Sequence, residues 1–167
     1  SAASDVYKRQ IINHANDKIL IIDLDLVSII EKIIDDCPNV EKVVILCSKA
    51  DVPSTKFSEV ISYEELLSMG SENFQWVDGE ETDACGICYT SGTTGNPKGV
   101  VYTHRSNTLH ALTQAAPDML NLSSTDTVMP VVPLFHANGW SIAYTAPLVG
   151  SSIVFPGGDL SPSSLYD

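Results

Sequence analysis

Residues 89–100 read Tyr-Thr-Ser-Gly-Thr-Thr-Gly-Asn-Pro-Lys-Gly-Val, and this stretch decides the expected fold and chemistry of the chain. Strand-like residues stand on both sides of it, at 84–88 and 100–103. Glycine lets a backbone approach an anion closely, and successive backbone N–H groups can form a concavity that binds one. Hydroxyl groups add donors, and a lysine adds a point charge suited to phosphate. The stretch therefore predicts a phosphate-binding loop formed by Thr90, Ser91, Gly92, Thr93, Thr94, Gly95 and Lys98.

Two common nucleotide-binding patterns do not fit this loop. The Walker pattern Gly-x-x-x-x-Gly-Lys-Ser/Thr, started at Gly92, would need glycine at Pro97 and a hydroxyl residue at Gly99. The dinucleotide pattern Gly-x-Gly-x-x-Gly fails because Gly92 and Gly95 stand three residues apart. A surface turn rich in glycine and threonine is the structural alternative, and the order of residues ahead of Lys98 disfavours it.

The stretch resembles the signature loop of the adenylate-forming superfamily, which includes acyl-CoA synthetases, luciferases and the adenylation domains of peptide synthetases. The family pattern is aromatic-Thr-Ser-Gly-Ser/Thr-Thr-Gly-x-Pro-Lys-Gly-Val, and every fixed position is met between Tyr89 and Val100. The resemblance implies a loop that closes over the phosphates of ATP while a carboxylate attacks the α-phosphate. By the same analogy, the hydroxyl of Thr90 lies on the Mg²⁺ side.

A second segment, Pro-Leu-Phe-His-Ala-Asn-Gly-Trp at 133–140, resembles the core motif that follows the phosphate loop in this family. A lone histidine is more often packed or solvated than catalytic, so His136 gains its weight from the first motif. The resemblance places His136 as a catalytic residue near the acyl carboxylate or adenylate. Phe-His-x-Asn-x-Trp resembles the fatty-acyl branch, in which Trp140 corresponds to the gate of the acyl tunnel. The alternative for Trp140 is an ordinary core aromatic on the following helix.

The resemblance implies an ATP-dependent carboxylate–CoA ligase that acts on a fatty acid or a similar acid. ATP and Mg²⁺ are the implied cofactors, coenzyme A is the second substrate, and the intact parent is a candidate homodimer. Two rival readings remain. One is another adenylate-forming enzyme, of the peptide-synthetase or luciferase type, which the Phe-His-x-Asn-x-Trp stretch disfavours. The other is a nucleotide-binding module without ligase chemistry, such as a phosphate-loop NTPase, which Pro97 and Gly99 disfavour.

The 167 residues are enough for one domain with a core. The resemblance implies a larger enzyme, with a large N-terminal region and a small mobile C-terminal domain. We therefore expect residues 11–167 to be part of an AMP-binding N-terminal domain truncated at both ends, and inactive alone. Residues 1–10, whose periodicity is poor, are interpreted as an artefactual leader. A helix start at Ser161 and Pro162, just before the last residue, supports the truncation.

The charge balance is strongly acidic, with 9 Lys and Arg against 21 Asp and Glu and a net charge of −12. This argues against nucleic acid and anionic membranes as partners. No apolar run approaches the ~18 residues that suggest a membrane helix, and the features of a secretion signal are missing. We expect a cytoplasmic protein.

Cys85 and Cys88 form a Cys-x-x-Cys pair, which is a pattern of zinc and redox sites. The pair falls on an expected strand, where residues three apart point to opposite faces. No second Cys/His pair has ligand spacing. We therefore interpret both cysteines as small buried hydrophobic residues.

Apolar runs predict strands at 18–22, 43–46, 84–89, 100–103, 127–132 and 152–155. Helical spacing predicts helices at 26–36, 105–116 and 140–149, the last shortened or kinked by Pro147. A capping box at 62–65 opens a further short helix that Gly70 closes. The alternation predicts an α/β fold of layered sheets with helices. The two strands beside the phosphate loop could instead pair as a hairpin, and 48–83 should be the least regular region.

Overall fold

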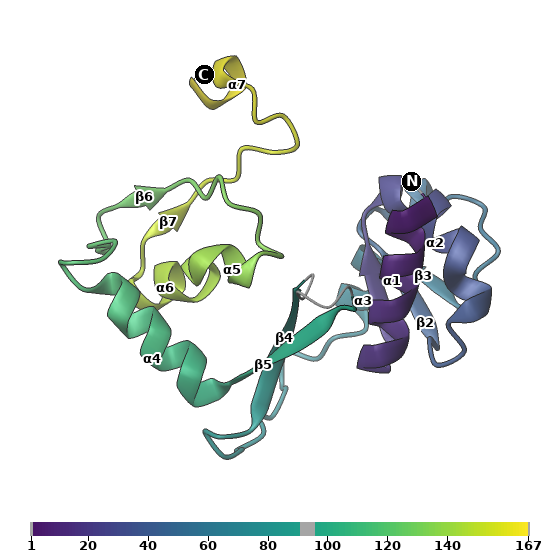
Figure 1. The fold of residues 1–167 in the computed structure, drawn as a ribbon, viewed down its shortest axis with the longest axis horizontal. Helices are drawn as coiled ribbons and strands as arrows, with labels where there is room; N and C mark the ends of the chain where they lie inside the picture. Colours follow the sequence, from purple (N-terminus) through teal and green to yellow (C-terminus); the bar gives the residue numbers. More distant parts are fainter. Residues whose placement is uncertain (1, 91–95, 167) are drawn as a thin grey trace. The chain divides into compact units, whose positions relative to one another are not determined.

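The computed structural model describes the backbone of residues 2–90 and 96–166 (Figure 1). The described chain forms two compact units, and each has its own packing. The first contains residues 2–77 with 96 and 97, and the second contains residues 78–90 and 98–166.

The first unit is built on a three-stranded parallel sheet in the order β1 (Ile19–Ile22), β2 (Lys42–Ile45) and β3 (Val60–Ser62). Parallel strands are usually buried and therefore read as continuous apolar runs. This explains why the first two strands could be predicted from the sequence. The third strand follows the polar segment 48–58, which contains only the short 3₁₀ turn η3 (Lys49–Asp51), and it was not predicted.

The core of the first unit lies between one face of the sheet and the helices α1 (Ala2–Ala15) and α2 (Val27–Ile33). The 3₁₀ turns η1 (Leu24–Leu26) and η2 (Ile34–Asp36) flank α2. The helix expected at 26–36 therefore corresponds to α2 together with η2 and the last residue of η1. The main core side chains are Ile12, Leu20, Ile22, Val27, Ile30, Ile33, Val43 and Ile45. On the other face of the same sheet Ile19 and Ile21 are more than half exposed.

Helix α1 includes residues that the sequence analysis set aside. Residues 2–10 continue into the same helix as 11–15, and the Arg9 guanidinium pairs with the Asp36 carboxylate at 2.8 Å. Ile12 is the buried anchor of α1 in the core. The weak periodicity of 1–10 concealed this helix, while the origin of these residues stays a prediction.

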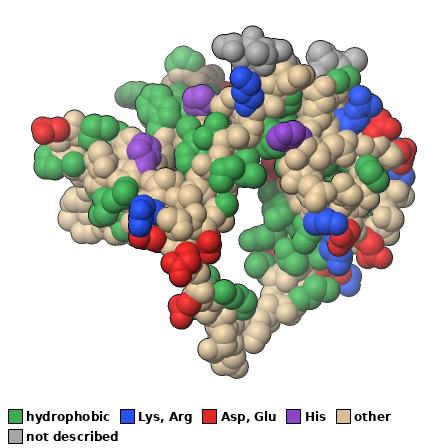
Figure 2. Space-filling model, turned by 60° about the horizontal axis from the view of Figure 1, so that its bottom comes forward, with side chains coloured by type: hydrophobic (Ala, Val, Ile, Leu, Met, Phe, Trp, Pro, Cys, Tyr) green, Lys and Arg blue, Asp and Glu red, His purple; other side chains and the backbone are tan. Residues whose placement is uncertain are grey.

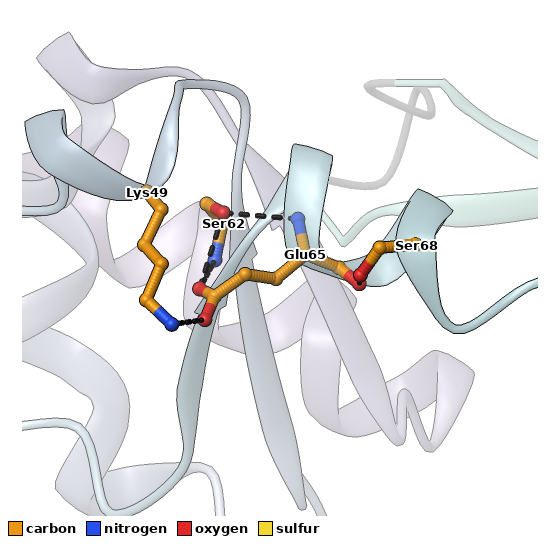
Figure 3. A network of polar contacts seen from close by, with 4 residues as sticks. All are labelled: Lys49, Ser62, Glu65 and Ser68. Atoms are coloured by element: carbon orange, nitrogen blue, oxygen red, sulfur yellow. Dashed lines mark hydrogen bonds and ion pairs between the residues drawn. The ribbon is translucent and has the colours of Figure 1, made fainter.

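Helix α3 (Tyr63–Ser68) begins with the predicted capping box, drawn in Figure 3. The Glu65 backbone N–H donates to Ser62 Oγ at 3.1 Å, and the Ser62 N–H donates to Glu65 Oε2 at 3.2 Å. Lys49 Nζ lies 2.9 Å from the other Glu65 oxygen. The hydrogen bond from Lys49, reinforced by those from Ser62, holds the pKa of Glu65 below its usual value.

The second unit opens with an antiparallel pair, β4 (Ala84–Thr90) and β5 (Lys98–Thr103), so the hairpin alternative is confirmed. The register shifts between Ala84 and Gly86, which marks a β-bulge. Helix α4 (His104–Ala115) follows at once, capped by Thr103 and Ser106. At its start Arg105 pairs with Glu81, and this hydrogen bond lowers the pKa of the Glu81 carboxyl.

The remaining strands of the second unit are shorter than expected. β6 (Thr127–Val128) and β7 (Ser152–Ile153) form a parallel pair, where the sequence predicted strands at 127–132 and 152–155. Pro130 has no N–H to donate to a ladder, so it limits the extension of β6. Helices α5 (Ala137–Trp140) and α6 (Ile142–Val149) lie between them, and α7 (Pro162–Tyr166) comes last.

The second unit has a small core. Helices α4 and α6 pack together, and Ala111 of α4 with Ile142 and Ala146 of α6 are the buried hydrophobic residues of this unit among those described. Large hydrophobic side chains of β4 and β5, such as Ile87 and Val101, are about half exposed. Figure 2 shows hydrophobic side chains, in green, at many places on the surface that it draws. Within the described residues, none of the helices has the length and apolar character needed to cross a membrane.

Candidate active site

The two ends of the predicted phosphate loop face each other across the hairpin. Thr90 is the last residue of β4 and Lys98 the first of β5, and the two are paired in the register. Directly opposite residues of an antiparallel pair have Cβ atoms about 4.5–5.5 Å apart on one face of the sheet. The predicted loop residues between them, Ser91, Gly92, Thr93, Thr94 and Gly95, lie outside the described residues.

Lys98 is exposed, and its ammonium has no carboxylate within ion-pair distance in the described part of the chain. Lys18, Lys49 and Lys56, in contrast, each pair with an acidic side chain. Lys32 and Lys42 also have no acidic partner among the described residues, so the unpaired charge leaves Lys98 available to an anion but does not distinguish it from them. This arrangement suits the phosphate-binding role predicted for Lys98.

Gly99, next to Lys98, packs closely against the side chains of Ile87 and Tyr89. Gly99 and Tyr89 are cross-strand partners, and a Cβ added to Gly99 would lie 3.3 Å from Tyr89 Cζ and 3.0 Å from Ile87 Cγ2. A larger residue would therefore require the Ile87 and Tyr89 side chains to shift by a few tenths of an ångström. The aromatic and glycine positions of the loop pattern thus form one packing unit at the base of the loop.

His136 precedes α5 and presents its side chain to solvent. Its backbone is fixed, because its N–H donates to the Pro133 carbonyl at 3.0 Å and its carbonyl accepts from the Gly139 N–H at 3.0 Å. No hydrogen bond to its imidazole is found among the described residues. The predicted catalytic histidine therefore has an anchored backbone and an accessible ring.

The segment after His136 is a left-handed turn. Five consecutive residues have positive φ, namely Ala137 (47°), Asn138 (55°), Gly139 (60°), Trp140 (57°) and Ser141 (66°). The left-handed conformation costs roughly 1–2 kcal/mol for each residue that has a Cβ, and such strain is typical of functional segments. The expected helix at 140–149 is therefore wrong at its start, because α6 begins only at Ile142. Pro147 lies inside α6.

Trp140 ends this turn with 54% of its surface exposed. The interpretation of Trp140 as a core aromatic is therefore wrong in this structure. Its neighbours Gly139 and Ser141 are both buried, so the backbone is held in place while the indole projects outward. The predicted gate role agrees with this geometry and stays a prediction.

A thiol links the two sequence motifs. Cys88, on the strand that leads into the phosphate loop, lies with its Sγ 3.6 Å from Asn138 Oδ1 in the left-handed turn. These two residues are 50 positions apart in the sequence. Their contact brings the base of the loop and the turn after His136 together within the second unit.

Cys85 departs from its predicted burial. Cys85 is exposed, and its Sγ lies 3.1 Å from Asn107 Nδ2 of α4. Cys88 is half-buried, so neither cysteine is a fully buried hydrophobic residue. The two thiols contact different elements, and the described residues contain no group of three or more His, Cys, Asp or Glu that could hold a metal ion.

A cavity of about 390 Å³ lies beside the turn, within the second unit. Residues from β5, α4, α5 and the start of α6 line it: Tyr102, Ser106, Asn107, His110, Ala137, Asn138 and Ser141. Most of this set was missed by the sequence analysis. One available signal was the α4 pair Asn107 and Ala111, because they are four residues apart and mark the inward face of that helix.

Comparisons with known proteins identify the family of the chain. The family model of AMP-binding enzymes matches residues 8–167. A medium-chain-fatty-acid–CoA ligase of Ectopseudomonas oleovorans is 46% identical over 93% of this chain, and a 3-methylmercaptopropionyl-CoA ligase of Ruegeria pomeroyi is 40% identical over 93%. The chain spans 28% and 29% of the lengths of these two relatives.

The fold is similar to solved structures of the same kind. The crystal structure of the anthranilate CoA ligase AuaEII in complex with anthranoyl-AMP matches 96% of this chain with a TM-score of 0.78, at 23% sequence identity. This chain covers 30% of that structure. The similarity confirms the expected α/β fold, that of the N-terminal region of an adenylate-forming ligase. The chain belongs to the AMP-binding enzyme family.

Proposed function

We propose that the complete protein carrying this chain is an ATP-dependent carboxylate–CoA ligase. A carboxylate oxygen attacks the α-phosphorus of ATP and releases pyrophosphate, which gives an acyl-adenylate. The CoA thiol then attacks the acyl carbon and displaces AMP. The observation that carries the proposal is the pairing of Thr90 with Lys98 at the two ends of the loop, with the turn after His136 held against the same hairpin.

Lys98 and the loop hydroxyls stabilise charge on the β- and γ-phosphates. Adenylation moves negative charge onto the leaving pyrophosphate, and fixed donors aimed at developing charge are usually the largest catalytic contribution. Lys98 fits this role because no acidic neighbour in the described residues neutralises it. The loop residues Ser91, Thr93 and Thr94 add hydroxyl donors by analogy with the family pattern.

The Thr90 hydroxyl is our candidate for a Mg²⁺ ligand. Magnesium takes oxygen ligands, and in nucleotide sites it binds the phosphates and several waters with only one or two protein groups. One hydroxyl at the end of β4 fits that donor set, and Mg²⁺ would screen the phosphate charge there.

His136 orients the acid. Its imidazole is exposed, and a neutral imidazole donates one hydrogen bond, here to the acyl carboxylate and later to the adenylate. Trp140, four residues further on, would close the acyl path. In this proposal residues 11–167 form part of a larger adenylate-forming domain, the acid and CoA are the substrates, and the complete enzyme is a homodimer.

The two half-reactions give the test. In the complete ligase, Lys98→Ala should slow acid-dependent exchange of pyrophosphate into ATP roughly a hundredfold, about 3 kcal/mol. Thioester formation from supplied acyl-adenylate should keep its rate, because pyrophosphate has already left. Lys32→Ala is the matched control, since Lys32 is an exposed lysine of α2 outside the site, and it should change neither rate.

Equal loss in both half-reactions of the Lys98 variant would contradict the assignment of Lys98 to the phosphates. The products separate the rival classes. AMP and pyrophosphate indicate adenylation, whereas ADP and phosphate indicate a phosphate-loop NTPase. A ligase must also release acyl-CoA when CoA is added.

A further inference from the structure

The left-handed turn after His136 needs support from outside itself. All five residues of 137–141 have positive φ, and such conformations persist only where the surrounding structure holds them. The Gly139 N–H donates to the His136 carbonyl at 3.0 Å, and the Ser141 N–H donates to the Ala137 carbonyl at 3.3 Å. Both hydrogen bonds join near neighbours in the sequence. They define the shape of the turn but not its place relative to the hairpin of β4 and β5.

The side chain of Asn138 supplies a contact to the hairpin. Its Oδ1 lies 3.6 Å from Cys88 Sγ on β4, and both residues are half-buried. A thiol is a weak donor and an amide oxygen is an acceptor, so the Cys88 S–H donates to Asn138. Asparagine also suits the turn, because it adopts the left-handed conformation more readily than most residues, and Asn138 has φ 55°. Asn138 thus combines the backbone that the turn needs with a side chain that reaches the hairpin.

Cys88 and Thr90 lie on the same face of the hairpin. Neighbouring side chains on a strand point to opposite faces. A Cβ added to Gly99 would touch the side chains of Ile87 and Tyr89, so these two share the other face. The register does not shift between Cys88 and Thr90. Thr90 therefore follows Cys88 on its face, about 7 Å further along the strand.

The contact fixes the turn on the side of the hairpin that the proposed reaction uses. Lys98 is the cross-strand partner of Thr90, and directly paired residues share a face. His136 stands two residues before Asn138 and has an anchored backbone. The hydrogen bond from Cys88 to the turn thus helps to set the distance between His136 and the two ends of the phosphate loop.

We propose that Cys88 and Asn138 are positioning residues of the ligase reaction. Their hydrogen bond holds His136, the residue assigned to the acid, at the working distance from Thr90 and Lys98. The proposal rests on the ligase function proposed above. Adenylation needs the carboxylate in line with the α-phosphorus, and a misplacement of ~1 Å can slow such a reaction roughly a hundredfold. Neither positioning residue touches the reacting atoms, so both act through the place of the turn.

A double-mutant cycle in the complete ligase tests the proposal. Cys88→Val removes the donor and keeps a side chain of similar size, and Asn138→Gly removes the acceptor without straining a residue at positive φ. Each change should lower kcat of acid-dependent pyrophosphate exchange about tenfold, because the acid is then held less precisely. The double variant should also lose about tenfold and not a hundredfold, since either change alone already breaks the bond. Cys88→Ser, which keeps a hydroxyl donor, should retain most of the rate.

Three further measurements separate positioning from stability. The KM for ATP should change less than about twofold in the single variants, because the loss is confined to the transition state. Thioester formation from supplied acyl-adenylate should keep its rate, because pyrophosphate has left and the spacing to the phosphate loop no longer matters. The size of the rate loss should not follow the melting temperature.

Two variants serve as matched controls. Cys85→Val changes another cysteine of β4, whose Sγ contacts Asn107 of α4. Asn121→Gly changes an exposed asparagine outside the turn that also has a positive φ, 51°. Neither variant should change the exchange rate.

Losses that multiply in the double variant would overturn the proposal, because the two residues would then act separately. A Cys88→Ser variant as slow as Cys88→Val would also overturn it, and so would a rate loss that follows the melting temperature. If Cys88→Val does not fold, the tenfold loss in Asn138→Gly and the retained rate of Cys88→Ser decide the proposal, and the absence of either overturns it. Failure of the ligase function looks different, because no acid would then support pyrophosphate exchange in the unmodified enzyme. That result would overturn this inference together with the function on which it rests.

Discussion

Trp140 lies between two buried residues, but its own side chain is exposed. Gly139 is buried beneath Leu134, where an added Cβ would lie 2.9 Å from Leu134 Cδ2. Ser141 is buried on the other side, and the indole between them is 54% exposed. A large aromatic in this position contributes little to the core of this chain and is available to a ligand.

Trp140→Ala in the complete ligase should therefore change selectivity more than stability. If the indole closes the acyl path, its removal should raise kcat/KM for long acids relative to short ones. The free energy of unfolding should change by less than about 1 kcal/mol, as is usual for exposed positions. The measurements are kcat/KM over a series of chain lengths and the melting temperature. A uniform loss for all acids that follows the melting temperature would show a structural role.

The sequence indicated the residues whose chemistry is carried by a local pattern. Thr90, Lys98 and His136 stand in two short motifs, so their places could be predicted. Asn107 and Ser141 lie outside those motifs, and only packing in space brings them to one cavity. The burial of Cys85 was predicted wrongly because a strand pattern does not show how much other elements cover the strand, and most of β4 is exposed in this chain.

Elements were predictable where one local interaction determines them. The capping box of α3 and the apolar runs of β1 and β2 are of this kind. The pairing of β4 with β5 stayed open because hydrophobic periodicity predicts which face of a strand is buried, but not which other strand it pairs with. The left-handed turn could not be predicted, since four of its five residues carry a Cβ and that conformation is unfavourable for each of them.

The capping box gives a pH-dependent contribution to stability. Because Lys49 and Ser62 lower the pKa of Glu65 in the folded state, the ionised carboxylate stabilises that state. This contribution is present in full above the ordinary value of 4.5 and is lost as the pH falls through the lowered folded value. Glu65→Gln should thus destabilise the chain at pH 6, and the difference from the unmodified chain should shrink towards pH 3.

Urea unfolding of both chains between pH 3 and pH 6 measures this difference. Glu64→Gln is the control, since Glu64 lies in the same turn without a hydrogen bond to Ser62 or an ion pair to Lys49. Its stability should follow that of the unmodified chain at each pH. A constant difference between Glu65→Gln and the unmodified chain over the whole range would contradict the assignment.

The two units differ in how deeply the strands of their sheets are buried. In the first, β2 is central in its sheet, and Val43, Val44 and Ile45 are buried. In the second, β4 and β5 form a two-stranded sheet with exposed apolar side chains, and such a pair is marginally stable without further packing. Large uncovered apolar areas mark surfaces that pack against other protein.

Hydrogen exchange on the isolated chain should show this difference directly. Amides of β2 should exchange at least about a hundredfold more slowly than those of β4, because local stability follows burial and contact. In the complete ligase the amides of β4 should become protected. Mass spectrometry of peptides covering 42–45 and 84–90 gives both rates. Equal protection of the two strands in the isolated chain would show that the hairpin needs no further cover.

The left-handed turn also determines how α6 starts. A serine just before a helix ordinarily caps it by accepting a hydrogen bond from an N–H of the first turn, and its loss then costs ~0.5–2 kcal/mol. Ser141 occupies that position, yet with φ at 66° its side chain makes no such bond. The helix is thus already uncapped, and removing the hydroxyl takes no cap from it. Ser141→Ala should therefore cost much less stability than the loss of an ordinary helix cap.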